Sequence, residues 1–314
     1  MFFTYRAFGK RTHGGATALC LLGALFLVSA CGESPVTTRQ SLLATVDSLI
    51  TDSGQEVAVY FKSLEGPDSL LIAPDLRMHA ASTMKVPVMI QLFLDRDAGL
   101  ISLEDSLEVT TTFRSIVDGS PYALEAESDS ETDLYGLEGT KVTYARLMEL
   151  MITLSSNLAT NILIQEADAQ RVTATMREMG ADSIQVLRGV EDGPAFQAGL
   201  SNTTTARDLG IIMERLARGE VGSPESSEEM MDILSRQHWN TKIPALLPPG
   251  TRVAHKTGRI TGISHDAGIV YPEGASPYVL VILTRGFEDG EVADAYAAQI
   301  SRVIFDHITH PLEN

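Results

Sequence analysis

The hydrophobic positions of this chain repeat every second residue near its two ends and with a helical period between them. Residues 56–64 alternate in this way and residues 69–72 follow after a turn, which predicts a hairpin of two strands. Residues 253–258, 266–271 and 278–284 predict three further strands, and the last is apolar at both sets of alternating positions, as a strand buried on both faces would be. We therefore expect one sheet assembled from both ends of the chain.

Helical periodicity fills most of the chain between these strands. The predicted helices comprise residues 39–51, 143–165 with an interruption at 154–157, 172–179, 205–218, 227–236 and 292–307. The fold class that we expect is α+β: an antiparallel sheet flanked by helices, with an all-helical domain inserted into it. The inserted domain would be residues 76–219, and the sheet domain residues 39–75 plus 220–314.

The first thirty residues have the pattern of a targeting signal. Three basic residues lie ahead of an apolar stretch at 16–28 that is too short to span a bilayer comfortably. The sequence Leu27-Val28-Ser29-Ala30-Cys31 resembles the end of a bacterial lipoprotein signal, which implies lipidation of Cys31, although a secretory signal cut near Ala30 or an uncleaved anchor would also fit. We expect residues 1–30 to be the lipoprotein signal and residues 31–38 a tether. The protein would then be exported and lipid-anchored on the periplasmic side of the cell envelope, and Gly32 favours the outer membrane.

Composition removes several classes of function. The formal net charge is −17 and no basic run occurs, so nucleic acid is an unsuitable partner. The two cysteines are Cys20 and Cys31, which leaves no thiol in the body of the chain for a disulfide or a nucleophile. His238 and His255 do not have the spacing of metal ligands. We expect a monomer without metal or cofactor.

A candidate nucleophile stands where the helical region begins. Ser82 precedes a long apolar run, and Lys85 follows it by three residues, on the same face of the predicted helix. A serine hydroxyl needs a base to remove its proton, and a lysine can act as that base only if burial or another cation lowers its pKa. The alternative is a helix-capping serine beside an unrelated surface lysine.

Two further short motifs follow in order: Ser155-x-Asn157 and Lys256-Thr257-Gly258. Each is common alone, but their order, separations and predicted element types together are much rarer. With Ser82-x-x-Lys85 they resemble the serine penicillin-recognising enzymes, specifically the class A β-lactamases, from about residue 40 to the C-terminal end. The resemblance implies the β-lactamase/transpeptidase-like version of the α+β fold given above.

The resemblance also implies a role for each motif residue. Ser82 would attack the β-lactam carbonyl, with the backbone amides of Ser82 and Arg259 as the oxyanion hole. Lys85 would deprotonate Ser82 or position the groups that do, and Ser155 would pass a proton to the departing nitrogen. The substrate-binding residues that it implies are Asn157, Lys256, Thr257, Gly258 and Arg259.

Rapid hydrolysis of the acyl-enzyme, or deacylation, distinguishes a β-lactamase from a peptidoglycan transpeptidase. In class A enzymes a glutamate on a loop activates the water that carries out this hydrolysis. The matching loop here is residues 188–194, in which Glu191 is the best candidate and Asp192 a weaker one. The loop is short, and Ala195 stands where the family has an asparagine. Asn202 replaces the aspartate that would form an ion pair with Arg188.

Two other departures lie near the motifs. Ser156 replaces the family's aspartate between Ser155 and Asn157, and His265 and Asp266 stand where many class A enzymes have a carboxylate-binding arginine. Three functions therefore remain open. They are a serine β-lactamase acting through Ser82 and Glu191, a D,D-peptidase or esterase acting on cell-wall peptides or small esters, and a penicillin-binding sensor that stays acylated.

Overall fold

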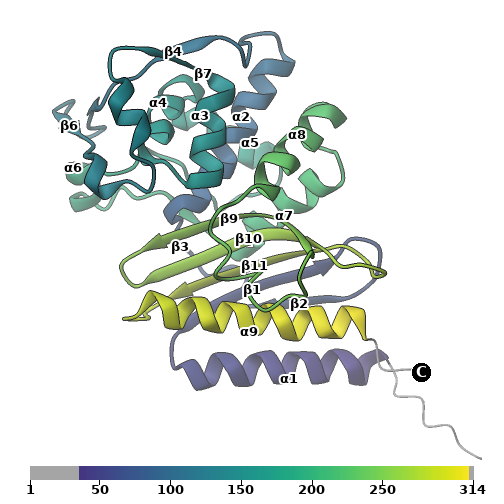
Figure 1. The fold of residues 1–314 in the computed structure, drawn as a ribbon. Coiled ribbons are helices and arrows are strands. Elements are labelled where there is room, and N and C mark those ends of the chain that lie inside the picture. The colour runs from purple at the N-terminus through teal and green to yellow at the C-terminus, as the bar shows by residue number, and fades with distance from the viewer. Residues whose placement is uncertain (1–34, 311–314) are drawn as a thin grey trace, which may run out of the picture. The chain divides into compact units, whose positions relative to one another are not determined.

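Five antiparallel strands form the sheet around which the structure is built (Figure 1). The structure is a computed structural model that describes residues 35–310, so the predicted signal and Cys31 lie outside the described residues. The strand order is β2-β1-β11-β10-β9. The bounds are β1 Glu56–Ser63, β2 Ser69–Ile72, β9 Arg252–Ile260, β10 Ile263–Tyr271 and β11 Tyr278–Arg285. All five predicted strands are confirmed, as is their assembly from the two ends of the chain.

The central strand shows why this sheet separates two cores. In β11, Val279, Val281 and Leu283 belong to one hydrophobic cluster, whereas Leu280 and Ile282 belong to the other. Because successive side chains of a strand point to opposite faces, a strand that is apolar throughout must be covered on both sides. This confirms the prediction of a strand buried on both faces.

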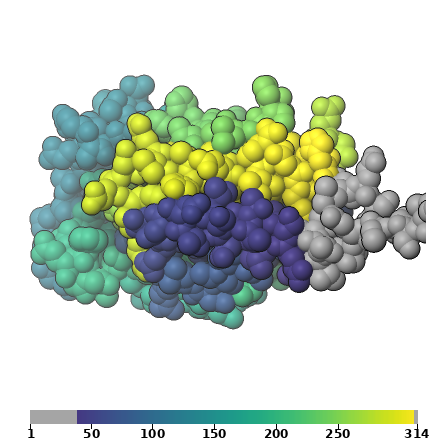
Figure 2. Space-filling view, turned by 90° about the horizontal axis from the view of Figure 1, so that it is seen from below, coloured from purple at the N-terminus to yellow at the C-terminus, as the bar shows by residue number. Residues whose placement is uncertain are grey.

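One face of the sheet is covered by two helices from opposite ends of the described chain. They are α1 (Pro35–Ser53) and α9 (Gly290–Thr309), which pack against each other (Figures 1 and 2). Residues 35–38, part of the expected tether, form the first turn of α1. Proline is well tolerated in the first turn of a helix, where its missing amide proton would have no intrahelical partner anyway, so Pro35 does not exclude a helix.

The other face carries the region inserted between β2 and β9. Its helices are η1 Ala81–Met84, α2 Lys85–Asp97, η2 Ala126–Ser128, η3 Asp133–Leu137, α3 Tyr144–Glu149, η4 Leu150–Leu154, α4 Asn157–Ala167, α5 Ala169–Glu178, α6 Gly193–Gln197, α7 Ala206–Ala217 and α8 Pro224–Ser235. Helix α7 packs directly on β1, β10 and β11 and is capped by Thr205, whose hydroxyl accepts from the amide of Asp208. The interruption predicted at 154–157 is confirmed between η4 and α4.

The inserted region is not wholly helical, which corrects the expectation of an all-helical domain. It contains three two-stranded pairs: β3 (Met78–His79) with β8 (Thr203–Thr204), β4 (Ser106–Glu108) with β7 (Lys141–Thr143), and β5 (Thr112–Arg114) with β6 (Pro121–Ala123). Strands of two or three residues are too short to show alternation in a sequence. Among the described helices, none combines the length and hydropathy needed to cross a membrane.

Candidate active site

Ser82 lies at the junction between the sheet and the inserted helices. It occupies a single turn of 3-10 helix, η1, which leads directly into the buried helix α2. The preceding residue, Ala81, has a φ of +45°, and its amide donates to Nδ1 of His79 over 2.9 Å. A left-handed conformation at a residue with a side chain costs energy and is common at functional sites, so the turn that presents Ser82 is strained.

Strand β9 passes close to the backbone of Ser82. A Cβ added to Gly258 would lie 3.0 Å from the Ser82 nitrogen and 3.2 Å from the Thr83 nitrogen. Only glycine allows this approach without displacing one of the two segments. The Lys-Thr-Gly motif therefore places the edge of β9, including the amide of Arg259, beside the candidate nucleophile.

Lys85 links the first motif to the second. Its Nζ is buried and donates to the Ser155 carbonyl over 2.7 Å, to Asn157 Oδ1 over 3.0 Å and to Ser155 Oγ over 3.3 Å. Burial lowers the pKa of Lys85 to about 7, against the opposing attraction of Asp129 and Glu191. A lysine with such a pKa is partly neutral near pH 7 and is competent to accept a proton.

Lys256 meets Lys85 at the same hydroxyl group. Its Nζ is also fully buried and donates to Ser155 Oγ over 3.1 Å and to the Thr257 carbonyl over 2.9 Å. Burial and then the charge of Lys85 lower the pKa of Lys256 well below its ordinary value. Ser155 itself adopts a φ of +62° after the π-helical turn η4, which directs the motif loop between the two lysines.

Glu191 lies within the same network. Its Oε1 accepts from Nδ2 of Asn157 over 3.0 Å, so Asn157 contacts both Lys85 and Glu191. Glu191 has a φ of +60°, and Asn161 fixes the loop beside it through both the amide and the carbonyl of Val190. The structure thus brings Glu191 and Lys85 to the same side chain, that of Asn157.

Within the described residues, hydrogen bonds rather than an ion pair close the loop that carries Glu191. Asn202 accepts from the amides of Leu187 and Arg188 and donates to the carbonyl of Arg188, while the Arg188 guanidinium donates to the carbonyl of Leu200. An asparagine side chain can both donate and accept, so it satisfies backbone groups that a carboxylate could not. The loop is thus closed through backbone hydrogen bonds.

The contacts of Asp192, the weaker candidate for the base, hold the loop in place. Its carboxylate accepts from the Ser115 hydroxyl over 2.7 Å, the Ile116 amide over 3.0 Å and the Ala195 amide over 3.0 Å. The last of these caps helix α6. These bonds join the loop to the β5–β6 hairpin.

Asp129 is a site residue that the sequence did not reveal. Its two oxygens accept from the amides of Asn157, over 2.9 and 3.0 Å, and Leu158, over 2.9 Å, at the N-terminus of α4. Ser156, which stands in place of the family's aspartate, lies 3.5 Å away. The 117–141 segment therefore supplies a carboxylate to the loop from outside it, and only tertiary structure shows this.

The two residues that replace the family's carboxylate-binding arginine are structural. His265 Nε2 contacts the carbonyl of His79 over 3.0 Å and its Nδ1 the amide of Thr284 over 3.1 Å. Burial lowers the pKa of His265 to about 4, so the ring is neutral at pH 7. Asp266 accepts from the amide of Ile243 over 3.1 Å and contacts His255. Neither residue supplies a positive charge to a substrate.

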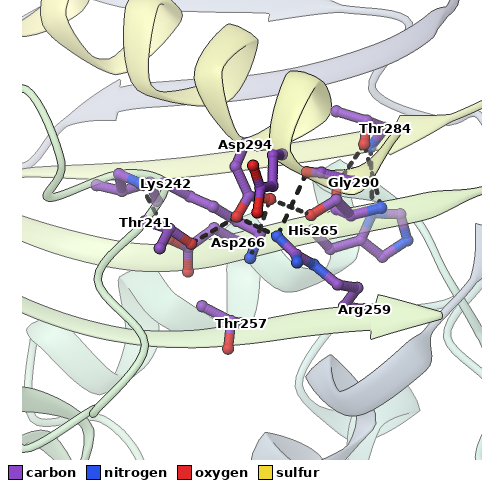
Figure 3. A network of polar contacts seen from close by, with 12 residues as sticks. Thr241, Lys242, Thr257, Arg259, His265, Asp266, Thr284, Gly290 and Asp294 are labelled. Atoms are coloured by element: carbon purple, nitrogen blue, oxygen red, sulfur yellow. Dashed lines mark hydrogen bonds and ion pairs between the residues drawn. The ribbon is translucent and has the colours of Figure 1, made fainter. Parts of the chain in front are cut away.

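An open cleft of roughly 930 Å³ runs from Ser82 past Thr257 to the start of α9. At that far end, Asp294 holds Arg259 and Lys242 (Figure 3). The described residues include no group of three His, Cys, Asp or Glu side chains arranged to hold a metal ion.

Comparison with known proteins agrees with this geometry. A model described as the beta-lactamase enzyme family matches residues 41–308. The chain is 29% identical over 169 residues to a beta-lactamase of Streptomyces albus G, covering 51% of this chain and 54% of that protein. It is 27% identical over 173 residues to the carbapenem-hydrolyzing beta-lactamase KPC of Klebsiella oxytoca, covering 53% and 59% respectively. The chain therefore spans somewhat more than half the length of these curated relatives.

Among solved structures, PBP-A is similar with a TM-score of 0.73 and 27% identity, covering 85% of this chain and 95% of PBP-A. A mutant of PBP-A forms an acyl-enzyme complex with penicillin G; its TM-score is 0.71 at 27% identity, covering 87% and 96%. These similarities extend over nearly all of the described residues.

Proposed function

The chain belongs to the beta-lactamase enzyme family, and from this premise we propose that it is a serine hydrolase that opens β-lactam rings. The observation that carries the proposal is the double contact of Asn157, which accepts from Lys85 and donates to Glu191. Acylation needs a base near Ser82, and hydrolysis needs a second base that can activate water. Lys85 and Glu191 supply the two.

In the first step, Ser82 Oγ attacks the ring carbonyl carbon and transfers its proton to neutral Lys85. The amides of Ser82 and Arg259 stabilise the negative oxygen that develops. The carbon–nitrogen bond then breaks, and the nitrogen receives a proton through Ser155, whose hydroxyl lies between the two lysines. The product is an ester on Ser82.

In the second step, Glu191 takes a proton from a water molecule that attacks this ester. The ester bond breaks, the Ser82 oxygen receives the proton that Glu191 took from the water, and the opened acid leaves. Glu191 is held in a strained conformation by the Asn161 contacts to Val190, so its carboxylate is preorganised for this step.

A second candidate is an acyl-serine enzyme that acts on cell-wall peptides. Penicillins would acylate it, and water would release the acyl group only slowly. The acyl-enzyme of the PBP-A mutant with penicillin G favours it, since that protein shares 27% identity over nearly its whole length. The two functions differ in how fast water releases the Ser82 ester. A sensor that remains acylated would be the limiting case.

Mass spectrometry of the protein mixed with benzylpenicillin tests the proposal. We expect a transient adduct that is absent in Ser82→Ala, and an adduct in Glu191→Gln that persists at least about 100-fold longer. Asp192→Asn is the matched control: it should lower the melting temperature without prolonging the adduct, because Asp192 caps α6 and holds the hairpin. A persistent adduct in the unmodified protein would support the second candidate, and no adduct would refute both.

A further inference from the structure

The far end of the cleft contains two cations that share one buried carboxylate. Asp294 lies in the first turns of α9, and its side chain is only 6% exposed. One of its oxygens accepts from the Arg259 guanidinium and from the Thr241 hydroxyl over 2.5 Å. The other accepts from the Ser264 hydroxyl over 2.6 Å and lies 3.4 Å from Lys242 Nζ.

The two cations line the cleft and are candidates for contact with a substrate. The Arg259 side chain is 47% exposed and that of Lys242 is 3% exposed, and both residues line the cleft together with Thr257 (Figure 3). Free, they would attract a substrate carboxylate at this end of the cleft. Asp294, however, already provides them with a carboxylate, in a position fixed by two hydroxyl donors.

The ionised state of Asp294 follows from its contacts. Burial opposes its charge, but the Ser264 and Thr241 hydroxyls and the two cations outweigh burial and hold the pKa of Asp294 below its ordinary value. It therefore carries a full negative charge at neutral pH. Glu291, one turn earlier and exposed, adds another acid to the same wall and forms no ion pair within the described residues.

Resting on the proposed acyl-serine function, we propose that Asp294 is a specificity-determining residue, an internal counter-ion that withholds Arg259 and Lys242 from the substrate. The site then gains little from a carboxylate on the substrate, and its preferred substrates include uncharged acyl compounds. Removing the negative charge of Asp294 would convert this end of the cleft into an anion site.

Binding can be measured without chemistry in a Ser82→Ala background, with benzylpenicillin and its methyl ester as a pair that differs only in the carboxylate. We expect Asp294→Asn to increase the affinity for benzylpenicillin about tenfold and the affinity for the ester less than about twofold, because the freed cations attract only the anion. Adding Arg259→Gln should remove most of this gain. Glu291→Gln is the matched control, since it removes a negative charge from the same wall without releasing a cation, and it should change both affinities less than about twofold.

A second measurement needs no change at Asp294. In the Ser82→Ala protein, raising salt from about 20 mM to about 500 mM should weaken benzylpenicillin less than about twofold, since the cations are already neutralised. A roughly tenfold weakening, an unchanged or weaker affinity in Asp294→Asn, or an equal gain for the ester would each overturn the inference. These binding results do not depend on acylation, so the adduct experiment can fail while this inference stands, and the reverse.

Discussion

Replacing Lys85 with methionine, which removes the proposed base, should change the free energy of unfolding by an amount that depends steeply on pH. The pKa of Lys85 falls from its ordinary 10.5 to about 7 in the folded state. At about 1.4 kcal/mol for each unit, this corresponds to a cost on the order of 5 kcal/mol at pH 7. Against this, methionine leaves the acceptors of Ser155 and Asn157 without their donor, at about 1–3 kcal/mol each.

The pH dependence of the difference is the sharper quantity. Between pH 7 and 10.5 the unfolded chain binds a proton at Lys85 that the folded chain does not, so the penalty is absent above about pH 10.5 and complete at about pH 7. The unpaired acceptors cost the same at every pH. The free energy of unfolding of Lys85→Met, relative to that of the unmodified protein, should therefore fall by about 4 kcal/mol between about pH 7 and about pH 10.

Urea unfolding at constant ionic strength measures this difference directly. Lys141→Met is the matched control, because Lys141 is exposed in the folded chain and its contribution should not vary over the same range. A difference between Lys85→Met and the unmodified protein that stays within about 1 kcal/mol across these pH values would refute the argument that burial dominates at Lys85.

Two more predictions concern the backbone around the site. Asp129→Asn should slow acylation by penicillin about tenfold and lower the free energy of unfolding by about 1–2 kcal/mol, because a charged acceptor is lost at the N-terminus of α4. Stopped-flow acylation and urea unfolding measure these two effects. The control is Asp133→Asn, at an exposed residue, which should change neither quantity. Gly258→Ala should slow acylation at least about 100-fold by separating β9 from Ser82, and should lower the free energy of unfolding by about 1–3 kcal/mol. In the control Gly136→Ala the added Cβ meets nothing within 4 Å, so this variant should be acylated at the normal rate. Equal acylation rates in the two variants would contradict the close approach of Gly258 to Ser82.

The sheet and the motif residues could be predicted because each leaves a local signal. Four of the five strands are eight or nine residues long, and β11 is apolar on both faces, so its central place follows from its composition. Ser82, Lys85, Ser155 and Lys256 carry recognisable spacings. Hydrogen bonds of Lys85 and Lys256 to Ser155 join the last three, and Gly258 approaches the backbone of Ser82.

The remaining site residues depend on contacts between segments far apart in the chain. Asp129 acts on α4 from a loop of unremarkable acidic composition, and Asp294 meets Arg259 only when α9 packs on the sheet, against β10 and β11. The role of Asn202 was also hidden, since its replacement of an aspartate indicated the loss of an ion pair but not the backbone bonds that close the loop instead. A carboxylate or amide can serve many partners, and its sequence neighbours do not say which one the fold provides.

The pairing of β1 with β11 has a consequence for how this molecule reaches its working state. Glu56 pairs with Arg285, so the sheet cannot close until almost the whole chain has been made and brought together, and entropy opposes so long a closure. Ser82 and Gly258, which lie close together in the fold, also come from segments that are far apart in the sequence. The ability to be acylated should therefore arise late in folding, and a penicillin that labels Ser82 would report on chains that have completed the sheet.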